Sequence, residues 1–417
     1  MTGRTALYAW LAFLVIVIAV SAAYLPKYYH TYEVWQDRDA IPWGLLVPSY
    51  VYFALASTGS SIVNSLYTVF GYKGERKGFE KVIKHGVWFS LITIIPAWIM
   101  IILDLGRADH FTWMIKGFNV ESRIAWMGVL YSFFFLMLLI ELVYFIRADA
   151  NPRLKEWKAA ELTIAILVLF ATIAVHSNLG EVFGCSTGVP GWYGSHVGAY
   201  FIASAVLIGA AWQAFYYTII YSLKGGLSGD KVFEAGETGL NNDLRAFITK
   251  TYNLIFLVGI PTLGFFELWN AIAAYYYPPA WAAFKQLLYG EFKADYWIIE
   301  IGFGLIVSTI LAIYGYLRRS LAATFVNAII LILAGYVSKI DFIIAGQIGR
   351  LAFSYGGLTN NLNPYHVRFW PYHFEVPTSE AMMLVLAVSI WLLLLTLGEV
   401  LLPLERGEPP KRWWVFR

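Results

Sequence analysis

The sequence predicts an all-α integral membrane protein with ten transmembrane helices. Of its 417 residues, 59% are hydrophobic and only 14% are charged, whereas roughly a quarter of the residues in a soluble domain are charged. A helix of about 20 apolar residues crosses a hydrocarbon layer of about 30 Å. Stretches that meet this requirement lie at 6–24, 43–70, 85–105, 124–146, 160–183, 196–223, 251–277, 297–317, 321–338 and 380–402.

Three of these stretches need a separate argument. The first follows Arg4 and ends in small residues at 21–23, which is also typical of a signal peptide, but we expect it to be retained as a helix. The third and the seventh contain Pro96 and Pro261, at corresponding places along the chain. Proline is tolerated in membrane helices when neighbouring groups satisfy the freed carbonyl, so we expect both stretches to span the membrane.

The basic residues predict the orientation, because positively charged loops stay in the cytoplasm. With the N-terminus inside, the cytoplasmic segments hold 20 of the 30 Lys and Arg residues, and the outer segments hold 10. Both termini are therefore expected in the cytoplasm, and the chain is expected to be a multi-pass protein of the plasma membrane. The outer segments 24–42 and 345–378 are long and aromatic. They are predicted either to meet a partner protein or to anchor the helices at the membrane interface.

An internal similarity suggests a repeat. The segments 48–59 and 198–209 share a pattern of small and aromatic residues, each follows an outer tryptophan, Trp43 or Trp192, and both run inward. We interpret them as the first helices of two four-helix bundles in parallel repeat, with the first and tenth spans peripheral. The expected divisions are 1–42 for the first peripheral helix and outer loop, 43–190 and 191–345 for the bundles, and 346–417 for an outer loop, the tenth helix and a cytoplasmic tail.

Composition excludes several functions. A net charge of +3 gives no basic surplus for nucleic acid. The single cysteine, Cys185, cannot ligate an iron-sulfur cluster or attach a c-type haem. Four of the seven histidines lie in outer loops, and His85 lies at the inner face. Of the remaining two, His176 and His196 share a side of the membrane but lie at different depths, so a bis-histidine haem is not expected. We predict neither haem nor an iron-sulfur cluster in this chain, and any metal redox centre must sit on another subunit.

Polar residues line one face of the second span. Tyr50, Ser57, Ser61, Asn64 and Thr68 are spaced by seven, four, three and four residues, which places them together on a helix. This face is expected to point into the first bundle. The hydroxyls of Ser and Thr can simply let helices pack closely, so Tyr50 and Asn64 are the stronger functional candidates.

Ionisable residues inside spans mark function by default, because burying them in lipid is costly. The first bundle contains Asp104, Glu141, Glu161 and His176, and the second contains Glu267, Glu300, Lys339 and Asp341. Two structural alternatives remain open. Lys339 could form an ion pair with Asp341 or Glu300, and the acids near the inner ends, Glu399 included, could reach the lipid headgroups.

Short segments in this order resemble the NrfD-like family, the polysulfide-reductase type of quinone-interacting membrane subunit. The similarity covers nearly the whole chain and rests on degenerate pieces at 42–44, 105–111, 176–180, 297–300, 335–347, 371–372 and 377–380. The ten-span layout looks like the longer members of that family. Lys339-Ile340-Asp341 departs from the arginine-centred motif expected there, which leaves the role of the second bundle in doubt.

The resemblance implies a membrane anchor subunit of a respiratory oxidoreductase with no isolated activity of its own. It would bind a quinone or quinol, of the menaquinone type or another, in the first bundle near the outer face, with no metal in this chain. Electrons would pass to or from an extracytoplasmic ferredoxin-like iron-sulfur subunit, which is joined to a molybdopterin-type catalytic subunit. Proton translocation could accompany this reaction.

Residue roles follow from quinone chemistry, which moves two electrons and two protons. His176 and Tyr50 are the candidates for hydrogen bonding the two carbonyls, with Ser57 nearby and Asn178 orienting His176. Arg107 and His110 are candidates for partner contact. The proton-transfer candidates are Asp104, for exchange with the outside, and Glu141, Glu161, Asn64, Glu267, Glu300, Asp341 and Lys339.

The alternative class is a secondary transporter. Parallel repeats and midplane carboxylates are common in transporters, whose helices are usually broken at mid-membrane. Pro96 and Pro261, one in each bundle, are the residues that could make such breaks.

Overall fold

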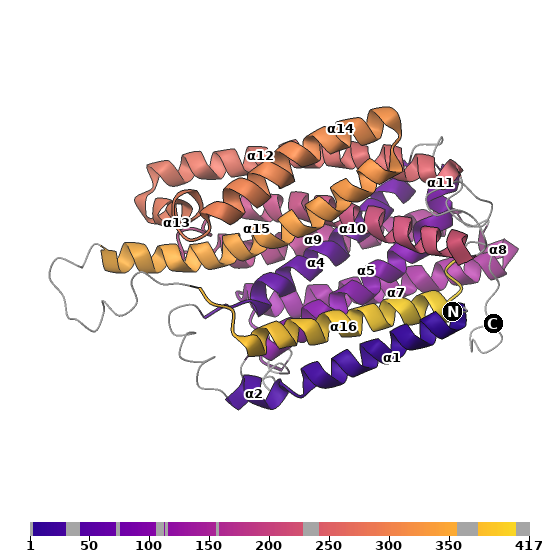
Figure 1. The fold of residues 1–417 in the computed structure, drawn as a ribbon, viewed down its shortest axis with the longest axis horizontal. Coiled ribbons are helices and arrows are strands. Elements are labelled where there is room, and N and C mark those ends of the chain that lie inside the picture. Colours follow the sequence, from indigo (N-terminus) through magenta and orange to yellow (C-terminus); the bar gives the residue numbers. More distant parts are fainter. Residues whose placement is uncertain are drawn as a thin grey trace.

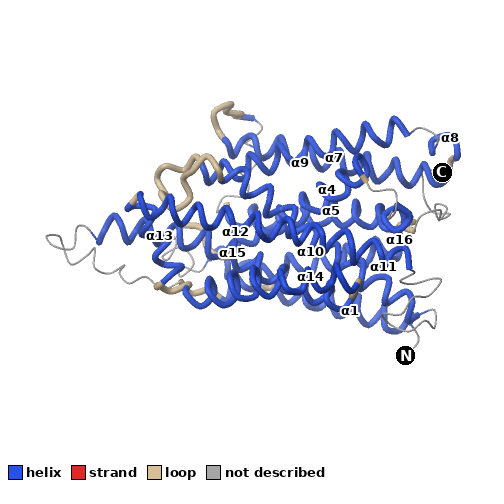
Figure 2. Tube along the Cα trace, turned by 90° about the horizontal axis from the view of Figure 1, so that it is seen from above, coloured by secondary structure: helices blue, strands red, loops and turns tan. Residues whose placement is uncertain are grey.

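The computed structural model describes residues 3–30, 42–71, 76–105, 112, 116–155, 158–227, 242–356 and 374–405. Every regular element within these ranges is helical. Ten of the helices are long and apolar enough to cross a membrane, and they run side by side along one axis (Figure 1, Figure 2). The predicted fold class and the number of spans are therefore confirmed.

The spans have the following bounds: α1 (Gly3–Ala22), α4 (Leu46–Phe70), α5 (Arg76–Asp104), α7 (Arg123–Ala150), α9 (Lys158–Gly184), α10 (Val197–Leu227), α12 (Asn253–Tyr276), η3 (Asp295–Val307) continued by α14 (Ser308–Arg318), α15 (Leu321–Gly356) and α16 (Thr378–Leu401). The shorter helices are α2 (Leu25–His30), α8 (Pro152–Lys155), α11 (Asn242–Phe247), η2 (Ile248–Tyr252) and α13 (Pro278–Leu288).

The spans pack as two groups of four. In the first group α4 and α7 each contact α5 and α9; in the second, α10 and α14 each contact α12 and α15. α4 and α10 join the groups, while α1 packs on α16 and α16 packs on α5. The rings of Trp43 and Trp192, the tryptophans of the proposed repeat, stack with centroids 5.1 Å apart. This arrangement agrees with two related bundles and two peripheral helices.

The two bundles meet where glycines let backbones touch. Gly59 of α4 and Gly209 of α10 occupy matching places in the repeat, and a Cβ added at Gly209 would lie 2.7 Å from the Cα of Gly59. The crossing is fastened by hydrogen bonds: Ser60 Oγ donates to the Gly209 carbonyl at 3.3 Å, and Gln213 Nε2 donates to the Ser60 carbonyl at 2.9 Å. α4 is consequently buried from Leu46 to Ser65 and forms the centre of the molecule.

Three features differ from the sequence-based expectation. α15 continues beyond residue 338 to Gly356, so Lys339 and Asp341 lie within a helix and not at its end. α13 is an additional helix between the seventh and eighth spans. The first half of the eighth span, η3, is wound as a π-helix, a form that is often found at functional sites.

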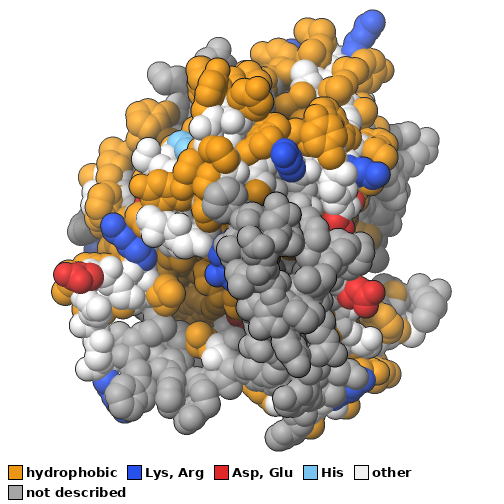
Figure 3. Space-filling model, turned by 90° about the vertical axis from the view of Figure 1, so that its left-hand side faces the viewer, with side chains coloured by type: hydrophobic (Ala, Val, Ile, Leu, Met, Phe, Trp, Pro, Cys, Tyr) orange, Lys and Arg blue, Asp and Glu red, His pale blue; other side chains and the backbone are white. Residues whose placement is uncertain are grey.

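α1 begins and α16 ends at the same end of the molecule (Figure 1). We refer to this as the inner end, in keeping with the predicted orientation, and to the opposite end as the outer end. Viewed from the outer end, the described surface is largely apolar with scattered charges (Figure 3). Its exposed aromatic residues include Tyr275, Tyr276, Tyr277 and Tyr289.

Candidate functional site

His176 lies in the outer half of α9 and is fully buried. Its Nδ1 is 2.8 Å from the hydroxyl oxygen of Thr58 on α4, and that hydroxyl donates to the Ala54 carbonyl at 2.8 Å. The Thr58 hydroxyl has one proton, and when it donates this proton to Ala54, Nδ1 carries the imidazole proton and donates it to Thr58. Nε2 is then an acceptor, and it has no hydrogen-bond partner among the described residues.

Two tyrosines accompany His176 in the first bundle. Tyr50 on α4 and Tyr131 on α7 are electrostatic neighbours with buried side chains, and the Tyr131 hydroxyl has no hydrogen-bond partner among the described residues. Tyr50 precedes Thr58 by eight residues, which corresponds to about 12 Å along the helix axis. The structure thus places Tyr50 outward of His176 and adds Tyr131, which the sequence pattern did not indicate.

Two further candidates, Ser57 and Asn178, have partners other than His176. Ser57 donates to the Ser90 carbonyl of α5 at 2.6 Å, and Asn178 Nδ2 donates to the Arg123 carbonyl at the start of α7 at 3.0 Å. Thr58, and not Asn178, therefore orients the imidazole. The sequence offered little warning, since Thr58 stands among small hydroxyl residues that ordinarily serve helix packing.

The outer candidates lie at the rim of the first bundle. Asp104 is the last residue of α5 and is partly buried. Arg107 and His110 lie outside the described residues. Nearby, Trp43, Trp192, Gln347 and Arg350 line an open hollow of about 420 Å³ at the outer end.

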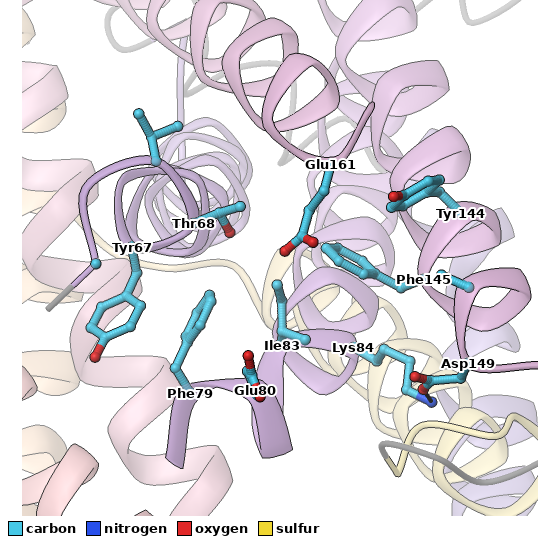
Figure 4. A pocket seen from close by; sticks show the side chains of 13 residues that line it. Tyr67, Thr68, Phe79, Glu80, Ile83, Lys84, Tyr144, Phe145, Asp149 and Glu161 are labelled. Carbon is cyan, nitrogen blue, oxygen red and sulfur yellow. Dashed lines mark ion pairs between the residues drawn. The ribbon is translucent and has the colours of Figure 1, made fainter. Parts of the chain in front are cut away.

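A second cavity, of about 110 Å³, opens at the inner end of the same bundle. Figure 4 shows Thr68, Glu80 and Glu161 around it, contributed by α4, α5 and α9, with the Lys84–Asp149 ion pair at one side. A polar space of this size holds several water molecules. Glu161 is also a charged neighbour of Glu141, so this water-accessible space leads toward a carboxyl group buried in the bundle.

Glu141 and Glu399 do not reach the lipid headgroups. Glu141 is only 1% exposed, and its Oε1 has no partner among the described residues. Glu399 of α16 lies 2.7 Å from His85 Nδ1 of α5 and is also hydrogen-bonded by Tyr216 of α10. Glu399 therefore ties the peripheral helix to both bundles.

Asn64 connects the bundles instead of pointing only into the first one. Its Oδ1 accepts from Gln213 Nε2 of α10 at 2.9 Å, and Gln213 Oε1 accepts from the Tyr252 hydroxyl at 3.0 Å. Ser57, on the same face of α4, points toward α5. The polar face of α4 is therefore divided between the two bundles.

In the second bundle the structure brings the four ionisable candidates together around α15. Lys339 is 1% exposed and donates to the hydroxyls of Tyr200 at 3.0 Å and Ser204 at 3.3 Å. Glu267 and Glu300 are its charged neighbours, and Glu300 lies within hydrogen-bonding reach of Asp341. The expected direct ion pair of Lys339 is thus replaced by hydrogen bonds to hydroxyls.

No group of three or more potential metal ligands occurs among the residues that the structure describes. The fold and these buried titratable groups define a multi-pass helical membrane protein with polar sites inside its bundles. The chain belongs to the NrfD polysulphide reductase family, whose sequence pattern matches residues 33–349.

Three known proteins are similar to this chain. An Hdr-like menaquinol oxidoreductase integral membrane subunit of Archaeoglobus fulgidus is 28% identical over 42% of each chain. A selenate reductase subunit of Mesobacillus selenatarsenatis is 22% identical over 64% of this chain and 66% of its own length. A putative dimethyl sulfoxide reductase membrane subunit of Halobacterium salinarum is 24% identical over 96% of this chain and 92% of its own.

The chain thus spans less than half of the first relative and about two thirds of the second. All three are named as subunits of oxidoreductases, two of them as membrane subunits. The resemblance to the NrfD family is confirmed.

Proposed function

We propose that this chain is the quinone-interacting membrane subunit of a respiratory oxidoreductase. It binds a quinone or quinol in the first bundle, toward the outer end, and exchanges electrons with an extracytoplasmic iron-sulfur subunit. The observation that carries the proposal is His176, whose Nδ1 is held by Thr58 and whose buried Nε2 has no partner among the described residues. Membership in the NrfD family and the menaquinol oxidoreductase named among the relatives support it.

The polar groups of the first bundle fit a quinone. A quinone needs a hydrogen-bonding group for each carbonyl oxygen and a group that exchanges protons. His176 Nε2 can accept a quinol proton, and the hydroxyls of Tyr50 and Tyr131 are the candidates to donate to the other oxygen. Since His176 is fully buried, the ring must displace neighbouring side chains to reach it.

Proton exchange requires a route from the site to water. Asp104 lies at the outer end of the bundle, while Glu141 and Glu161 connect its interior to the inner cavity. We assign Asp104 to exchange with the outside and the two glutamates to exchange with the cytoplasmic side. A quinone reaction that takes or gives protons on one side and electrons on the other contributes to the membrane potential.

The electron-transfer partner is assigned to the outer end. The described outer surface is largely apolar (Figure 3) and contains the open hollow beside Trp43 and Trp192. Exposed apolar patches of this kind mark protein contacts. We propose that a ferredoxin-like iron-sulfur subunit docks there and exchanges electrons with a molybdopterin-type catalytic subunit.

The transporter alternative lacks the helix breaks that would favour it. α5 runs without interruption through Pro96, and α12 does the same through Pro261. The described spans therefore do not show the discontinuous helices typical of secondary transporters.

The proposal is tested by replacing His176 with Ala in the complete complex. Quinone-coupled turnover should fall at least about 100-fold, because a positioned general base contributes about that much. Assembly with the iron-sulfur subunit and electron transfer to a soluble dye should stay intact. Binding of a fluorescent quinol analogue, followed by quenching, gives a second readout that does not depend on turnover.

The matched variants are Thr58→Val, which removes the partner of Nδ1, and Ser132→Ala on an exposed part of α7. Thr58→Val should weaken turnover about tenfold, and Ser132→Ala should leave it unchanged. If the His176→Ala complex assembles and keeps full quinone activity, His176 is structural and the proposed site is wrong.

A further inference from the structure

The second bundle contains a continuous chain of hydrogen bonds. The Lys339 ammonium donates to the Tyr200 hydroxyl oxygen at 3.0 Å, and that hydroxyl donates to Glu267 Oε1 at 3.2 Å. A hydroxyl that accepts from an ammonium and donates to a carboxylate can pass a proton between them, because it gives one proton away as it receives another. Lys339 on α15, Tyr200 on α10 and Glu267 on α12 therefore form a proton relay between three helices.

Next to this relay are two neighbouring carboxyl groups, and their closeness opposes the ionisation of both at the same time. Glu300 and Asp341 are within hydrogen-bonding reach of each other, yet both Asp341 oxygens lack a donor among the described residues although the side chain is 1% exposed. Two adjacent carboxylates repel, and a proton placed between them turns the repulsion into a hydrogen bond. The geometry of the pair is thus that of a proton-binding site.

Two cavities lie beside this cluster. One of about 80 Å³ is lined by Glu267, Glu300 and Lys339 but otherwise mainly by apolar side chains, and a second of about 20 Å³ reaches outward to His196. Both are lined by Tyr200 and Glu267. A polar space needs about 10–15 Å³ to hold one water molecule, so the smaller cavity, between Glu267 and His196, can hold one.

His196 stands where this path reaches the surface. Burial holds the pKa of His196 below its ordinary value, and the neighbouring Glu181 partly opposes that effect. The imidazole is accordingly neutral near pH 7 and has a free site for a proton that arrives from inside.

The cluster also touches the candidate quinone site through one aromatic ring. Lys339 Nζ lies 5.3 Å from the centroid of Phe201, and the imidazole of His176 lies 6.3 Å from the same centroid. These two distances limit the separation between the ammonium and the imidazole to about 12 Å, and the buried ring of Phe201 contacts both. Charges at that distance in a protein interior interact by roughly 1.4 kcal/mol, which is one pH unit.

We propose that the second bundle is an outward-opening proton-release path and that Lys339 couples it electrostatically to His176 across Phe201. When His176 gains a proton from quinol, the ammonium of Lys339 is repelled. It then passes its own proton through Tyr200 to Glu267, and Glu267 releases a proton to the water of the outer cavity. Each proton gained at His176 is matched by one released from Lys339 to the outer cavity. When His176 becomes neutral again, Lys339 takes a proton back from the same cavity through Glu267 and Tyr200. This inference rests on the proposed quinone site at His176.

The titratable groups that face Lys339 come from every helix packed around it. They are Tyr200 on α10, Glu267 on α12, Tyr296 and Glu300 on η3, Asp341 on α15 and His176 on α9. Removing the positive charge of Lys339 and removing a negative charge from one of these acids should therefore shift the pH profile in opposite directions.

The test is the pH dependence of quinol oxidation by the complete complex. Quinol oxidation needs a neutral His176, so the rate falls on the acid side as the imidazole becomes protonated. Lys339→Met removes a repelling charge and should move this acid limb up by roughly one pH unit, a tenfold loss of rate below the limb. Lys339→Arg should restore the wild-type profile, and Lys285→Met, at an exposed position on α13, should leave it unchanged.

Glu267→Gln should shift the acid limb in the opposite direction, to lower pH. The reason is that it removes a carboxylate that neutralises Lys339. Tyr200→Phe breaks the relay but keeps the charge, so proton release from the outer side of proteoliposomes, measured with an impermeant dye, should fall while the acid limb stays in place. If the Lys339→Met complex does not assemble, the shift of the acid limb in Glu267→Gln tests the inference alone. An unmoved limb in both variants overturns the inference, whereas absent quinone turnover in the wild-type complex overturns the proposed function itself.

Discussion

Two buried lysines, one in each bundle, are held in different ways. Lys84, at the inner end of the first bundle, lies 2.9 Å from Asp149 and donates to the carbonyls of Pro403 and Glu405 at 2.6 Å and 2.5 Å. Lys339, deep in the second bundle, donates to two hydroxyls. Both side chains are at most 2% exposed.

The difference indicates two separate roles. An ammonium that faces a carboxylate and two carbonyls keeps its proton and fixes its neighbours, and Lys84 in this way ties the end of α16 to the first bundle. An ammonium bound by hydroxyls, with carboxyls as its next neighbours, can give its proton away at smaller cost. Burial alone therefore does not distinguish a structural charge from a mobile one, but the identity of the direct partners does.

The strongest test of this comparison is Lys84→Met. Removing one partner of a buried ion pair leaves the other charge uncompensated, so the variant should lose about 3 kcal/mol of stability. Lys339→Met should lose less than half as much, because its direct partners are neutral. Thermal unfolding of both variants in the same detergent measures the difference, and equal losses would contradict the distinction.

The double variant Lys84→Met with Asp149→Asn measures how much the ion pair between these two residues contributes to stability. Since it removes both charges, it should be more stable than Lys84→Met alone by at least about 1 kcal/mol. The same unfolding assay, completed with Asp149→Asn, gives the coupling energy. A coupling near zero would mean that the main-chain carbonyls hold Lys84 without help from Asp149.

A third variant, Glu141→Gln, tests the inner route of the first bundle. Glu141 is buried near the cavity that contains Glu161 (Figure 4). Loss of a proton carrier should slow quinone-coupled turnover about tenfold, at the low end of general acid–base effects. Dye-coupled electron transfer should be unaffected, and Glu121→Gln, at an exposed outer position, is the control. Unchanged turnover in Glu141→Gln would remove this residue from the path.

The smallest expected effect concerns the labelling of Cys185, which also reports which end of the molecule faces outward. The exposed thiol donates to Glu181 Oε2 at 3.1 Å, and this hydrogen bond raises the pKa of Cys185 above its ordinary value. Glu181→Gln should lower that pKa and speed labelling by an impermeant maleimide at neutral pH by roughly threefold, because more thiolate is present. Labelling of intact cells from outside is expected, and labelling only after the membrane is opened would reverse the orientation.

Most of the fold could be predicted from the sequence because the bilayer imposes a simple length requirement. The ten predicted stretches correspond to the ten observed spans, and the largest departure is α15, where the predicted span ends at residue 338 but the helix continues to Gly356. In the structure the charges of Lys339 and Asp341 face an acidic cluster and hydroxyls inside the second bundle, so the helix continues past them. Periodicity along one helix does not reveal such partners on other helices.

The candidate site was less accessible to sequence reasoning. His176 stood out because an ionisable residue in a span is rare, but its partner Thr58 is chemically ordinary and 118 positions away in the chain. Asn178 seemed the natural partner because it is close in sequence, yet two residues along a helix place a side chain on nearly the opposite face. The assigned roles of these residues in quinone binding and proton transfer stay predictions.

The contact between Gly59 and Gly209 restricts how the two halves can move. A Cβ added at Gly59 would lie 1.7 Å from the Ala205 carbonyl oxygen, and one added at Gly209 would lie 2.2 Å from the Gly59 carbonyl carbon. The backbones of α4 and α10 are therefore in direct contact at this point. Any turn of either helix that brings a residue with a side chain to the crossing would push the two bundles apart.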